Sequence, residues 1–239
     1  MSNPTAAMLV IGDEILSGRT RDANLHFLAG KLTEAGIDLR EMRVVGDVPD
    51  AIQSAVRALS EAYTYVFTSG GIGPTHDDIT ADNIAAAFGV AIDVREDARA
   101  ILQAHYDRSG LEMNAARLRM ARIPEGAALI ENPISAAPGF ILHNVYVMAG
   151  VPSIFEAMVA SVLPTLTGGT PLTSRSLTIH RGEGDVAAPL TELAARYPAL
   201  SFGSYPFQRD GAYGTNIVIR GQDAAMVEAA LADLAALAE

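Results

Sequence analysis

The segment from Thr68 to Thr80, TSGGIGPTHDDIT, constrains the fold of this chain more than any other. It follows the apolar run YVF at residues 65–67 and precedes a helix-like segment that begins at Ala81. Its glycines let the backbone bend or approach another group closely, and its proline fixes one further backbone angle. A strand, a glycine turn and a helix start present backbone N–H groups and a positive dipole end. The segment therefore predicts a site for an anion such as phosphate, with a plain structural turn as the alternative.

Carboxylates in the same segment suggest a second component of the site. Asp77 and Asp78 are adjacent, and a divalent cation bridging to phosphate would explain why they lie beside an anion site. We expect one to face the ligand or metal and the other to cap the following helix; the alternative is two capping or solvated carboxylates. His76 neighbours these carboxylates, and its near-neutral pKa would suit proton transfer. The other candidate ligand-binding residues of the segment are Ser69, Gly70, Gly71, Gly73, Pro74, Thr75 and Thr80.

Composition excludes several classes of protein. The 239 residues carry a net charge of −11 and a single lysine, Lys31, which argues against a nucleic-acid partner or an anionic membrane surface. The absence of cysteine excludes disulfides and thiolate metal sites. No apolar run is long enough to span a membrane, and the N-terminus does not have the pattern of a signal peptide. We expect a cytoplasmic globular protein.

Strands and helices are predicted to alternate over the first third of the chain. Apolar runs predict strands at residues 6–11, 38–45 and 65–67. Apolar residues at helical spacing predict a helix over residues 24–35, closed by Gly36, and a second helix that begins at Pro49. This alternation predicts a parallel sheet with helices on both faces, an α/β/α three-layer fold.

Two more polar clusters directly follow predicted strands. Gly12, Asp13 and Glu14 follow the first strand, and Asp47 follows the second. Because ligands bind beyond the carboxyl ends of parallel strands, we expect these clusters and the Thr68–Thr80 segment to meet at one rim. Asp13 and Glu14 either contact the ligand or metal, or cap a helix. Asp47 is a candidate ligand because Gly46 beside it would allow close approach.

The rest of the chain predicts further elements and a boundary. Helices are expected at residues 95–109, 114–122 and about 152–166, and extended runs at 128–130, 140–142 and 145–148. TGGTP at residues 167–171 is the best linker, so we expect domains at 1–168 and 172–239. The second domain has strands at 176–179, 199–204 and 216–220 and helices at 185–196 and 224–238, a small βαββα α+β unit.

Three further residues outside the rim clusters are candidate ligand contacts. Asn24 either donates to a ligand or is the N-cap of the helix that starts at Leu25. Asn132 and Gly139 bracket a Pro-containing loop, NPISAAPGF, which either closes over the ligand or is a structural turn.

These motifs resemble a known family. TSGGIGPTHDDIT, GDEILSG at residues 12–18, RDANLHFLAGKLTEAGI at 21–37 and VVGD at 44–47 are similar to the molybdopterin-binding fold shared by MogA, MoaB and gephyrin. The likeness is greatest to CinA-like (competence/damage-inducible) proteins and covers roughly residues 6–165. GSYP at residues 203–206, within the βαββα unit, is similar to their small KH-like domain. The resemblance also suggests that the C-terminal amidohydrolase domain of full-length CinA is absent.

The resemblance implies a molybdopterin-like or nucleotide ligand that carries phosphate or pyrophosphate. Some CinA-like domains are metal-dependent pyrophosphatases acting on ADP-ribose or FAD, which implies a divalent metal (Mg, Mn or Co). By motif position, the functional acids of the MogA branch correspond to Asp47 and Asp78, which become the candidate catalytic and metal-binding residues. Homo-oligomers are common on this fold, so we expect one here.

The sequence departs from the family pattern in two places. CinA-like proteins usually have Gly-Thr where Ile134-Ser135 stand, and LPGVPSE where this chain has MAGVPSI, so that Ile154 replaces a glutamate. These differences bear on catalysis more than on fold. We therefore expect ligand binding at the rim; the alternatives are a metal-dependent pyrophosphatase and a molybdopterin adenylyltransferase-like enzyme.

Overall fold

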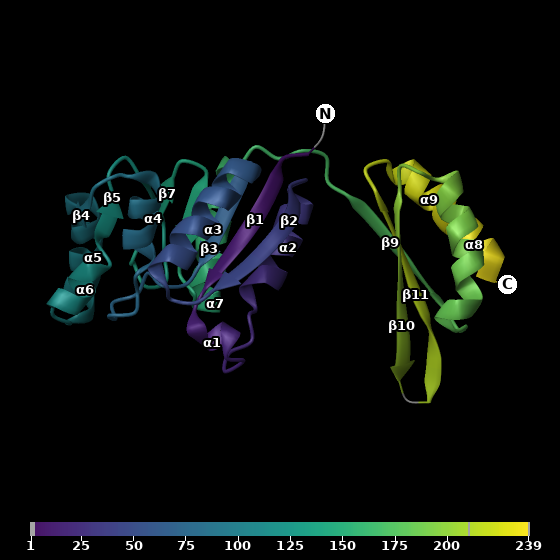
Figure 1. The fold of residues 1–239 in the computed structure, drawn as a ribbon, viewed down its shortest axis with the longest axis horizontal. Coiled ribbons are helices and arrows are strands. Elements are labelled where there is room, and N and C mark those ends of the chain that lie inside the picture. Colours follow the sequence, from purple (N-terminus) through teal and green to yellow (C-terminus); the bar gives the residue numbers. More distant parts are fainter. Residues whose placement is uncertain (1–2, 210, 239) are drawn as a thin grey trace. The chain divides into compact units, whose positions relative to one another are not determined.

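The chain folds into two compact units, Met1–Gly169 and Thr170–Glu239. The computed structural model describes residues 3–209 and 211–238 (Figure 1). The first half of the larger unit contains β1 Thr5–Ile11, α1 Asp13–Leu16, α2 Asn24–Glu34, β2 Asp38–Val45, α3 Pro49–Ala62, β3 Tyr65–Ser69 and α4 Thr80–Phe88. The second half contains β4 Ile92–Val94, α5 Glu96–Ser109, α6 Ala115–Arg119, β5 Arg122–Pro124, β6 Ala128–Ile130, β7 Gly139–Leu142, β8 Val145–Met148, α7 Pro152–Val162 and a 3₁₀ turn, Leu163–Thr165.

The central sheet of the larger unit has the strand order β2-β1-β3-β8-β7-β6. β1 pairs in parallel with β2 and β3, and β3 pairs in parallel with β8. β7 and β6 continue the sheet antiparallel. The sheet is therefore mostly parallel, and its β7–β6 edge is an antiparallel addition that the strand–helix alternation does not predict. Only His143 and Asn144 connect β7 to β8, and a parallel pair would need a long crossover.

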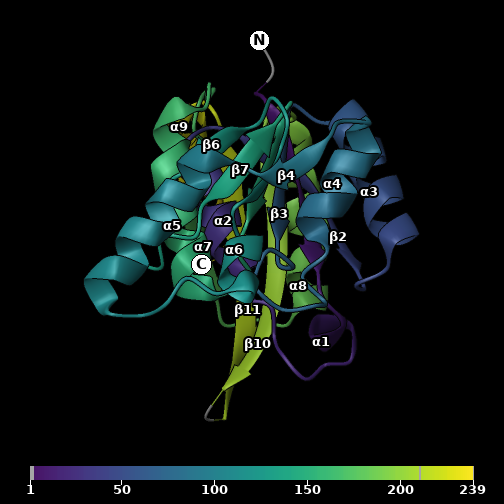
Figure 2. The ribbon, with the colours of Figure 1, turned by 90° about the vertical axis from the view of Figure 1, so that its left-hand side faces the viewer.

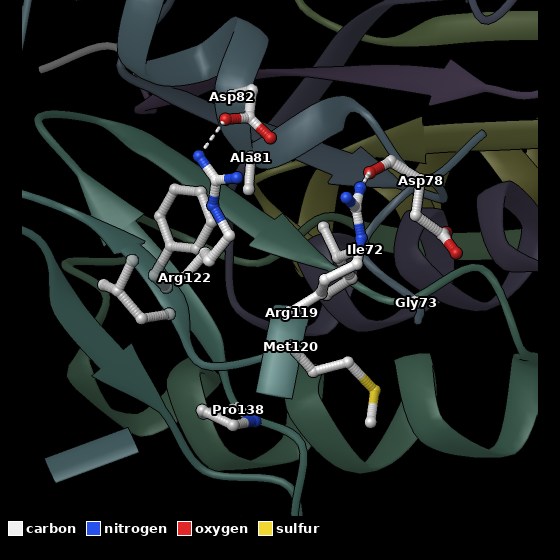
Figure 3. Close-up of a pocket in the computed structure, with 12 residues that line it drawn as sticks. Ile72, Gly73, Asp78, Ala81, Asp82, Arg119, Met120, Arg122 and Pro138 are labelled. Carbon is white, nitrogen blue, oxygen red and sulfur yellow. Dashed lines mark hydrogen bonds and ion pairs between the residues drawn. The ribbon is translucent and has the colours of Figure 1, made fainter. Parts of the chain in front are cut away.

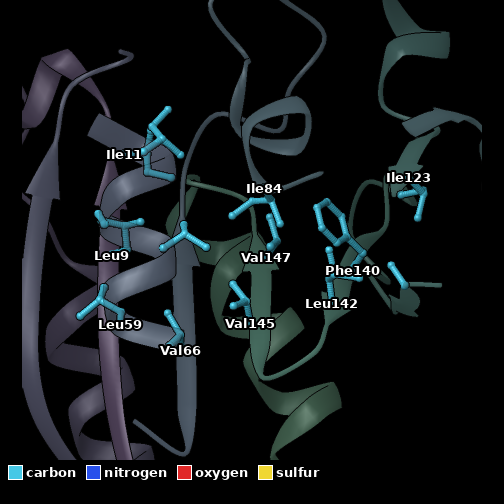
Figure 4. Close-up of a cluster of buried hydrophobic side chains, with 14 of the residues drawn as sticks. Leu9, Ile11, Leu59, Val66, Ile84, Ile123, Phe140, Leu142, Val145 and Val147 are labelled. Atoms are coloured by element: carbon cyan, nitrogen blue, oxygen red, sulfur yellow. The ribbon is translucent and has the colours of Figure 1, made fainter. Parts of the chain in front are cut away.

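Successive side chains of β1 point to opposite faces of this sheet and are buried on both. Leu9 and Ile11 point into a core with residues of α3, α4 and α5, including Leu59 and Ile84 (Figure 4). Met8 and its neighbours at every second position point into the other core, with residues of α2 and α7. The three-layer arrangement predicted from the strand–helix alternation is confirmed.

Local sequence explains where several helices begin and end. α2 ends before Gly36, whose φ of 68° is a left-handed conformation that favours glycine. The N–H of Ile37 then donates to the Leu32 carbonyl across 2.8 Å, closing the helix end. α7 ends at Val162 rather than near residue 166, because Pro164 lacks an N–H group for a further helical bond.

The segment after α5 differs from the prediction of one helix over residues 114–122. Asn114 accepts a hydrogen bond from the Arg117 N–H at 2.9 Å and caps α6, which ends at Arg119. Arg122 belongs instead to β5, which forms a two-stranded antiparallel sheet with β4. These elements are at the left of Figure 1 and face the viewer in Figure 2.

The smaller unit has the predicted βαββα order. It contains β9 Thr173–Ile179, α8 Glu183–Arg196, β10 Ser201–Arg209, β11 Ala212–Gly221 and α9 Ala224–Ala238. The strands form an antiparallel sheet in the order β10-β11-β9. Both helices contribute to its core, with Val186 and Leu193 from α8 and Val227 and Leu234 from α9. None of the helices in the described part of the chain is long and apolar enough to cross a membrane.

Candidate functional site

Three polar segments meet at the carboxyl ends of β1, β2 and β3. The N–H of Gly12 donates to the carbonyl of Val45 at 3.1 Å, and the N–H of Asp13 donates to Oδ2 of Asp47 at 3.0 Å. These bonds join the segment after β1 to the segment after β2. Gly70 directly follows β3, the other neighbour of β1. The parallel register of these strands therefore forms a single rim, as the sequence predicts.

A cavity of about 520 Å³ opens at this rim. Its lining includes predicted site residues from all three segments and from the loop before β7: Gly12, Glu14, Asp47, Gly70, Gly71, Gly73, Pro74, Asp77, Asp78 and Asn132. Other predicted site residues are outside this lining: Asp13, Asn24, Ser69, Thr75, Thr80 and Gly139.

The glycine loop, residues 70–79, forms one wall of the cavity. Gly70 and Gly71 have φ values of 108° and 69°, which disfavour any residue with a Cβ. A Cβ on Gly70 would lie 2.2 Å from the carbonyl oxygen of Ile11, so glycine also lets the loop pack on the end of β1. The N–H groups of Gly71, Ile72 and Gly73 donate to no acceptor within the described residues. Three consecutive free N–H groups at the cavity wall can bind an anion.

Asp78 is held within the glycine loop rather than at the helix. Its Oδ2 accepts hydrogen bonds from the Thr75 N–H at 2.8 Å and from the Thr75 hydroxyl. α4 has Ile79 at its N-cap and no side-chain cap, so neither Asp77 nor Asp78 caps it, contrary to the expectation for one of them. The Asp77 and His76 side chains are exposed, at 64% and 99%. Of the adjacent pair, Asp78 has the more fixed position.

Asp47 lies among other carboxylates. Its pKa is raised above the ordinary value, first by burial and then by the charges of Asp13, Glu14 and Asp77, while the hydrogen bond from the Asp13 N–H opposes the rise. The small size of Gly46 suggests that a ligand could approach closely there. It does not leave such a path, because a Cβ on Gly46 would lie 2.4 Å from Oδ1 of Asp13. The Asp13 carboxylate already fills that space. Repulsion within this cluster is what a bound cation would relieve.

Asn24 connects the end of β3 to the segment after β8 through hydrogen bonds of its buried side chain. It is 3% exposed, and its Nδ2 donates to Oγ of Ser69 at 2.7 Å and to the Gly150 carbonyl at 2.9 Å. The capping alternative for Asn24 is wrong: Ala23 is at the N-cap of α2, and Asp22 before it accepts a hydrogen bond from the Leu25 N–H at 2.9 Å. Asn24 and Ser69 line a smaller hollow of about 60 Å³ next to the main cavity.

Thr80 and Gly139 are packed closely against neighbouring atoms and do not line the cavity. Thr80 is fully buried, and a Cβ on Gly71 would lie 2.1 Å from its Oγ1. Gly139 begins β7, where a Cβ would lie 2.4 Å from the carbonyl oxygen of Val147. Both residues are therefore positioned by close packing.

Asn132 organises the loop before β7. Its Oδ1 accepts from the N–H groups of Ile134 and Ser135, and its Nδ2 donates to the Ser135 hydroxyl and the Ala137 carbonyl. These bonds use the hydrogen-bonding capacity of the Asn132 amide within the loop itself. Ser135 and Ala137 line the cavity, and Ile134 is 50% exposed.

An apolar wall of the cavity was not predicted from the sequence. It comes from the segment between β8 and α7, the first turn of α7, the glycine loop and the residue after α6: Ile72, Met120, Ala149, Val151, Pro152 and Ile154. The segment AGVP at 149–152 follows a strand in the same way as the three predicted clusters. That signal could have identified this part of the wall, since β8 is parallel to β3.

A metal at this rim would have to be held by few protein ligands. Among the described residues, no group of three or more His, Asp or Glu side chains could hold a metal ion. Mg²⁺ is commonly bound by one or two carboxylates together with substrate phosphates and water. Asp47 and Asp78, which both line the cavity, fit that simpler arrangement.

Family comparison agrees with the geometry of the rim. Residues 7–178 match the probable molybdopterin binding domain family. The chain belongs to this family. Residues 171–239 match a second family, the middle domain of FAD synthase. The molybdopterin-binding domain thus accounts for the sheet, the glycine loop and the cavity.

Similar proteins support the same assignment. The chain is 33% identical over 256 residues to a probable FAD synthase of Caenorhabditis elegans, covering 96% of this chain and 49% of that protein. It therefore spans about half the length of that relative. It is also 33% identical over 242 residues to a protein of Pyrococcus abyssi, covering 93% and 92% of the two chains.

The chain is also similar to a solved structure of a CinA protein. The crystal structure of CinA from Thermoplasma acidophilum, described as a protein of unknown function, is 35% identical with a TM-score of 0.62. The match covers 67% of this chain and 98% of the Thermoplasma chain. The resemblance to CinA-like proteins is confirmed.

Proposed function

We propose that the rim cavity binds a phosphate-containing pterin or nucleotide. The observation that carries this proposal is the contrast between the two walls of one cavity. Ile72, Met120 and Ile154 offer apolar surface on which a flat ring can be buried. The free N–H groups from Gly71 to Gly73 offer donors for phosphate oxygens. A ligand with a ring at one end and phosphate at the other matches both walls.

A divalent cation (Mg²⁺, Mn²⁺ or Co²⁺) belongs to the proposal because the cavity is acidic. Glu14, Asp47, Asp77 and Asp78 all line it, and phosphate would be repelled by their charges. Asp78 and Asp47 are the proposed metal ligands, since each has an Oδ1 that accepts no hydrogen bond from the described residues. When bound, the cation would neutralise phosphate charge and polarise the phosphorus centre.

The comparisons suggest which ligands to test first. The family is named for molybdopterin, and a relative that covers most of this chain is a probable FAD synthase. Molybdopterin and FAD each combine a fused ring with phosphate. ADP-ribose has a smaller ring system joined to a diphosphate, so the three ligands together test which ring the apolar wall prefers.

Calorimetry and thermal unfolding of the whole chain would test the proposal. We expect at least one of molybdopterin, FAD and ADP-ribose to bind and to raise the Tm, more strongly with Mg²⁺, Mn²⁺ or Co²⁺ than with EDTA. Asp78→Asn and Asp47→Asn should weaken the metal-dependent part of the affinity. Asp107→Asn, which changes an exposed carboxylate on α5, is the matched control. Absence of binding by all three ligands in every metal would contradict the proposal.

Hydrolysis of a diphosphate bond is the second candidate function. The raised pKa of Asp47 favours it, because a carboxylate with more proton affinity is a better general base. In this reaction a water oxygen bonds to phosphorus, the phosphoanhydride P–O bond breaks, and Asp47 accepts the proton of the water. FAD would give FMN and AMP, which chromatography separates. At ligand and metal concentrations that saturate the weaker-binding variant, Asp47→Asn should lose turnover; turnover equal to that of wild type under these conditions would contradict the role of Asp47 as general base.

A further inference from the structure

Arg119 is a half-buried cation at the end of α6, and sequence reasoning did not connect it with the site. It lines a small cavity beside the main one, together with Gly71, Gly73 and Asp78 of the glycine loop. Its Nη2 lies 3.4 Å from the backbone carbonyl oxygen of Asp78, a long hydrogen bond (Figure 3). Gly71, Gly73 and Asp78 also line the main cavity, so Arg119 adjoins the part of the glycine loop that borders both cavities.

The charge of Arg119 is not neutralised by a carboxylate. The Asp78 carboxylate bonds to Thr75 instead, and Figure 3 shows it directed away from the guanidinium. Among the described residues, no ion pair includes Arg119, and its buried Nε, like that of Arg122, has no hydrogen-bond acceptor. Arg122 provides the contrast, because its Nη2 is 2.5 Å from Oδ1 of Asp82. Of the two arginines in this small cavity, only Arg119 lacks an ion pair with a carboxylate.

An unpaired, half-buried arginine in an acidic protein requires a physical reason. Partial burial of a cation costs free energy unless a hydrogen-bonded anion compensates. The chain has 28 Asp and Glu residues, so carboxylate partners are abundant in its sequence. A guanidinium presents a planar fork of donors that matches two oxygens of a phosphate. The free N–H groups of Gly71 and Gly73 are next to it, so two separate segments supply donors to the same place.

We propose that Arg119 binds a phosphate group of the ligand at the glycine-loop end of the cavity and so determines specificity for phosphorylated ligands. This inference rests on the proposed function, and it assigns one part of the ligand to one side chain. A purely structural role is the competing explanation: Arg119 would then only hold the Asp78 carbonyl and keep the glycine loop in shape. The two roles differ in whether replacement of Arg119 weakens binding only of ligands that carry phosphate.

Calorimetry with paired probes tests the inference. The probes are ADP with adenosine, and 6-hydroxymethylpterin diphosphate with 6-hydroxymethylpterin, each pair differing only in phosphate. We expect Arg119→Gln to weaken binding of the phosphorylated member of a pair by about tenfold or more, and to leave the other member nearly unchanged. Arg119→Lys, which keeps the charge but not the fork, should show a smaller loss.

Arg117→Gln is the matched control on the same helix. Arg117 bonds to the Glu112 carbonyl and stacks on Tyr106, so its removal should affect both members of each pair equally or not at all. Equal affinities of wild type and Arg119→Gln for the phosphorylated probes would overturn the inference and leave the proposed function standing. So would an equal loss for both members of a pair. Wild type that binds none of the four probes would overturn both. If Arg119→Gln does not fold, Arg119→Lys decides by the same comparison.

Discussion

Asn24 and Ser69 are joined by a hydrogen bond of 2.7 Å from the Nδ2 of Asn24 to the Oγ of Ser69. The second Nδ2 hydrogen goes to the Gly150 carbonyl, 2.9 Å away. One buried amide thus links the start of α2 to the ends of two adjacent parallel strands, β3 and β8. Because the glycine loop begins immediately after Ser69, this amide fixes where the loop leaves the sheet.

Removing the Asn24 amide should destabilise the larger unit in a graded series. Ser69→Ala removes one bond and should cost about 1 kcal/mol of unfolding free energy. Asn24→Ala leaves the Gly150 carbonyl without its partner and should cost about 2 kcal/mol. Asn24→Asp places a carboxylate oxygen against that carbonyl and should cost more than Asn24→Ala. Urea unfolding measures the order, and an Asn24→Asp variant as stable as wild type would contradict it.

Substitutions at two glycines of the loop should separate folding from binding. Gly71→Ala combines a positive φ with a Cβ 2.1 Å from Oγ1 of the buried Thr80, so it should destabilise by about 2 kcal/mol or more. A Cβ on Gly73 would meet Oδ2 of Asp78 at 2.6 Å, a flexible side chain that can move. Gly73→Ala should therefore change stability little and weaken metal-dependent ligand binding.

Gly30→Ala is the control for the glycine series. Gly30 lies within α2, and nothing is within 4 Å of a Cβ built there. This change should stabilise the chain by about 0.5–1 kcal/mol, because alanine favours helix over the unfolded state. Thermal unfolding and calorimetry on the same preparations give both quantities. A Gly73→Ala variant that loses stability but binds normally would show that Gly73 is required for folding and not for ligand binding.

The sequence predicts the rim well because strand ends have a clear local pattern. An apolar run that stops at glycine marks the end of β1, and the same reasoning places Asp47 and the glycine loop beside it. The edge of the sheet was predicted less well. The direction of β7 depends on the two residues His143 and Asn144 forming a tight connection, and His143 adopts a positive φ of 54°, which is uncommon for residues other than glycine.

Tertiary contacts explain the candidates that local patterns misassigned. Asparagine before an apolar helical segment has the pattern of an N-cap, yet Asn24 is one residue inside α2 and is buried by contact with Gly150, which is far away in sequence. Arg119 could not be assigned to the rim, because the segment around it was interpreted as one helix. Only the end of α6 at Arg119 and the pairing of β5 with β4 bring the guanidinium to the glycine loop.

Tyr63 should affect stability in a pH-dependent way through Glu41. Its hydroxyl donates to Oε2 of Glu41 at 2.7 Å. The hydrogen bond from Arg43, and then that from Tyr63, lower the pKa of Glu41 below its ordinary value. A lowered folded-state pKa contributes stability that is present above the unfolded-state pKa and is lost as pH falls through the folded-state pKa.

Tyr63→Phe removes one of these donors and keeps the ring. We expect the pKa of Glu41 to rise, so the variant should be less stable than wild type at pH 7 and nearly as stable at about pH 2, where Glu41 is protonated in both states. Urea unfolding at the two pH values and NMR titration of the Glu41 carboxyl would measure this. A stability difference that is the same at both pH values would show that packing, and not the hydrogen bond, causes it.

Ile154 should contribute to ligand affinity through the ring and not through phosphate. It lies on the apolar wall of the cavity, in the first turn of α7. Ile154→Ala removes apolar surface and should weaken binding by about three- to tenfold, by the usual free energy of a few buried methylene groups. The loss should be equal for a phosphorylated ligand and its dephosphorylated counterpart, unlike the loss expected for Arg119→Gln. Calorimetry of both variants with ADP, adenosine and the pterin pair compares them directly. A loss in Ile154→Ala confined to the phosphorylated probes would mean that the ring does not lie on this wall.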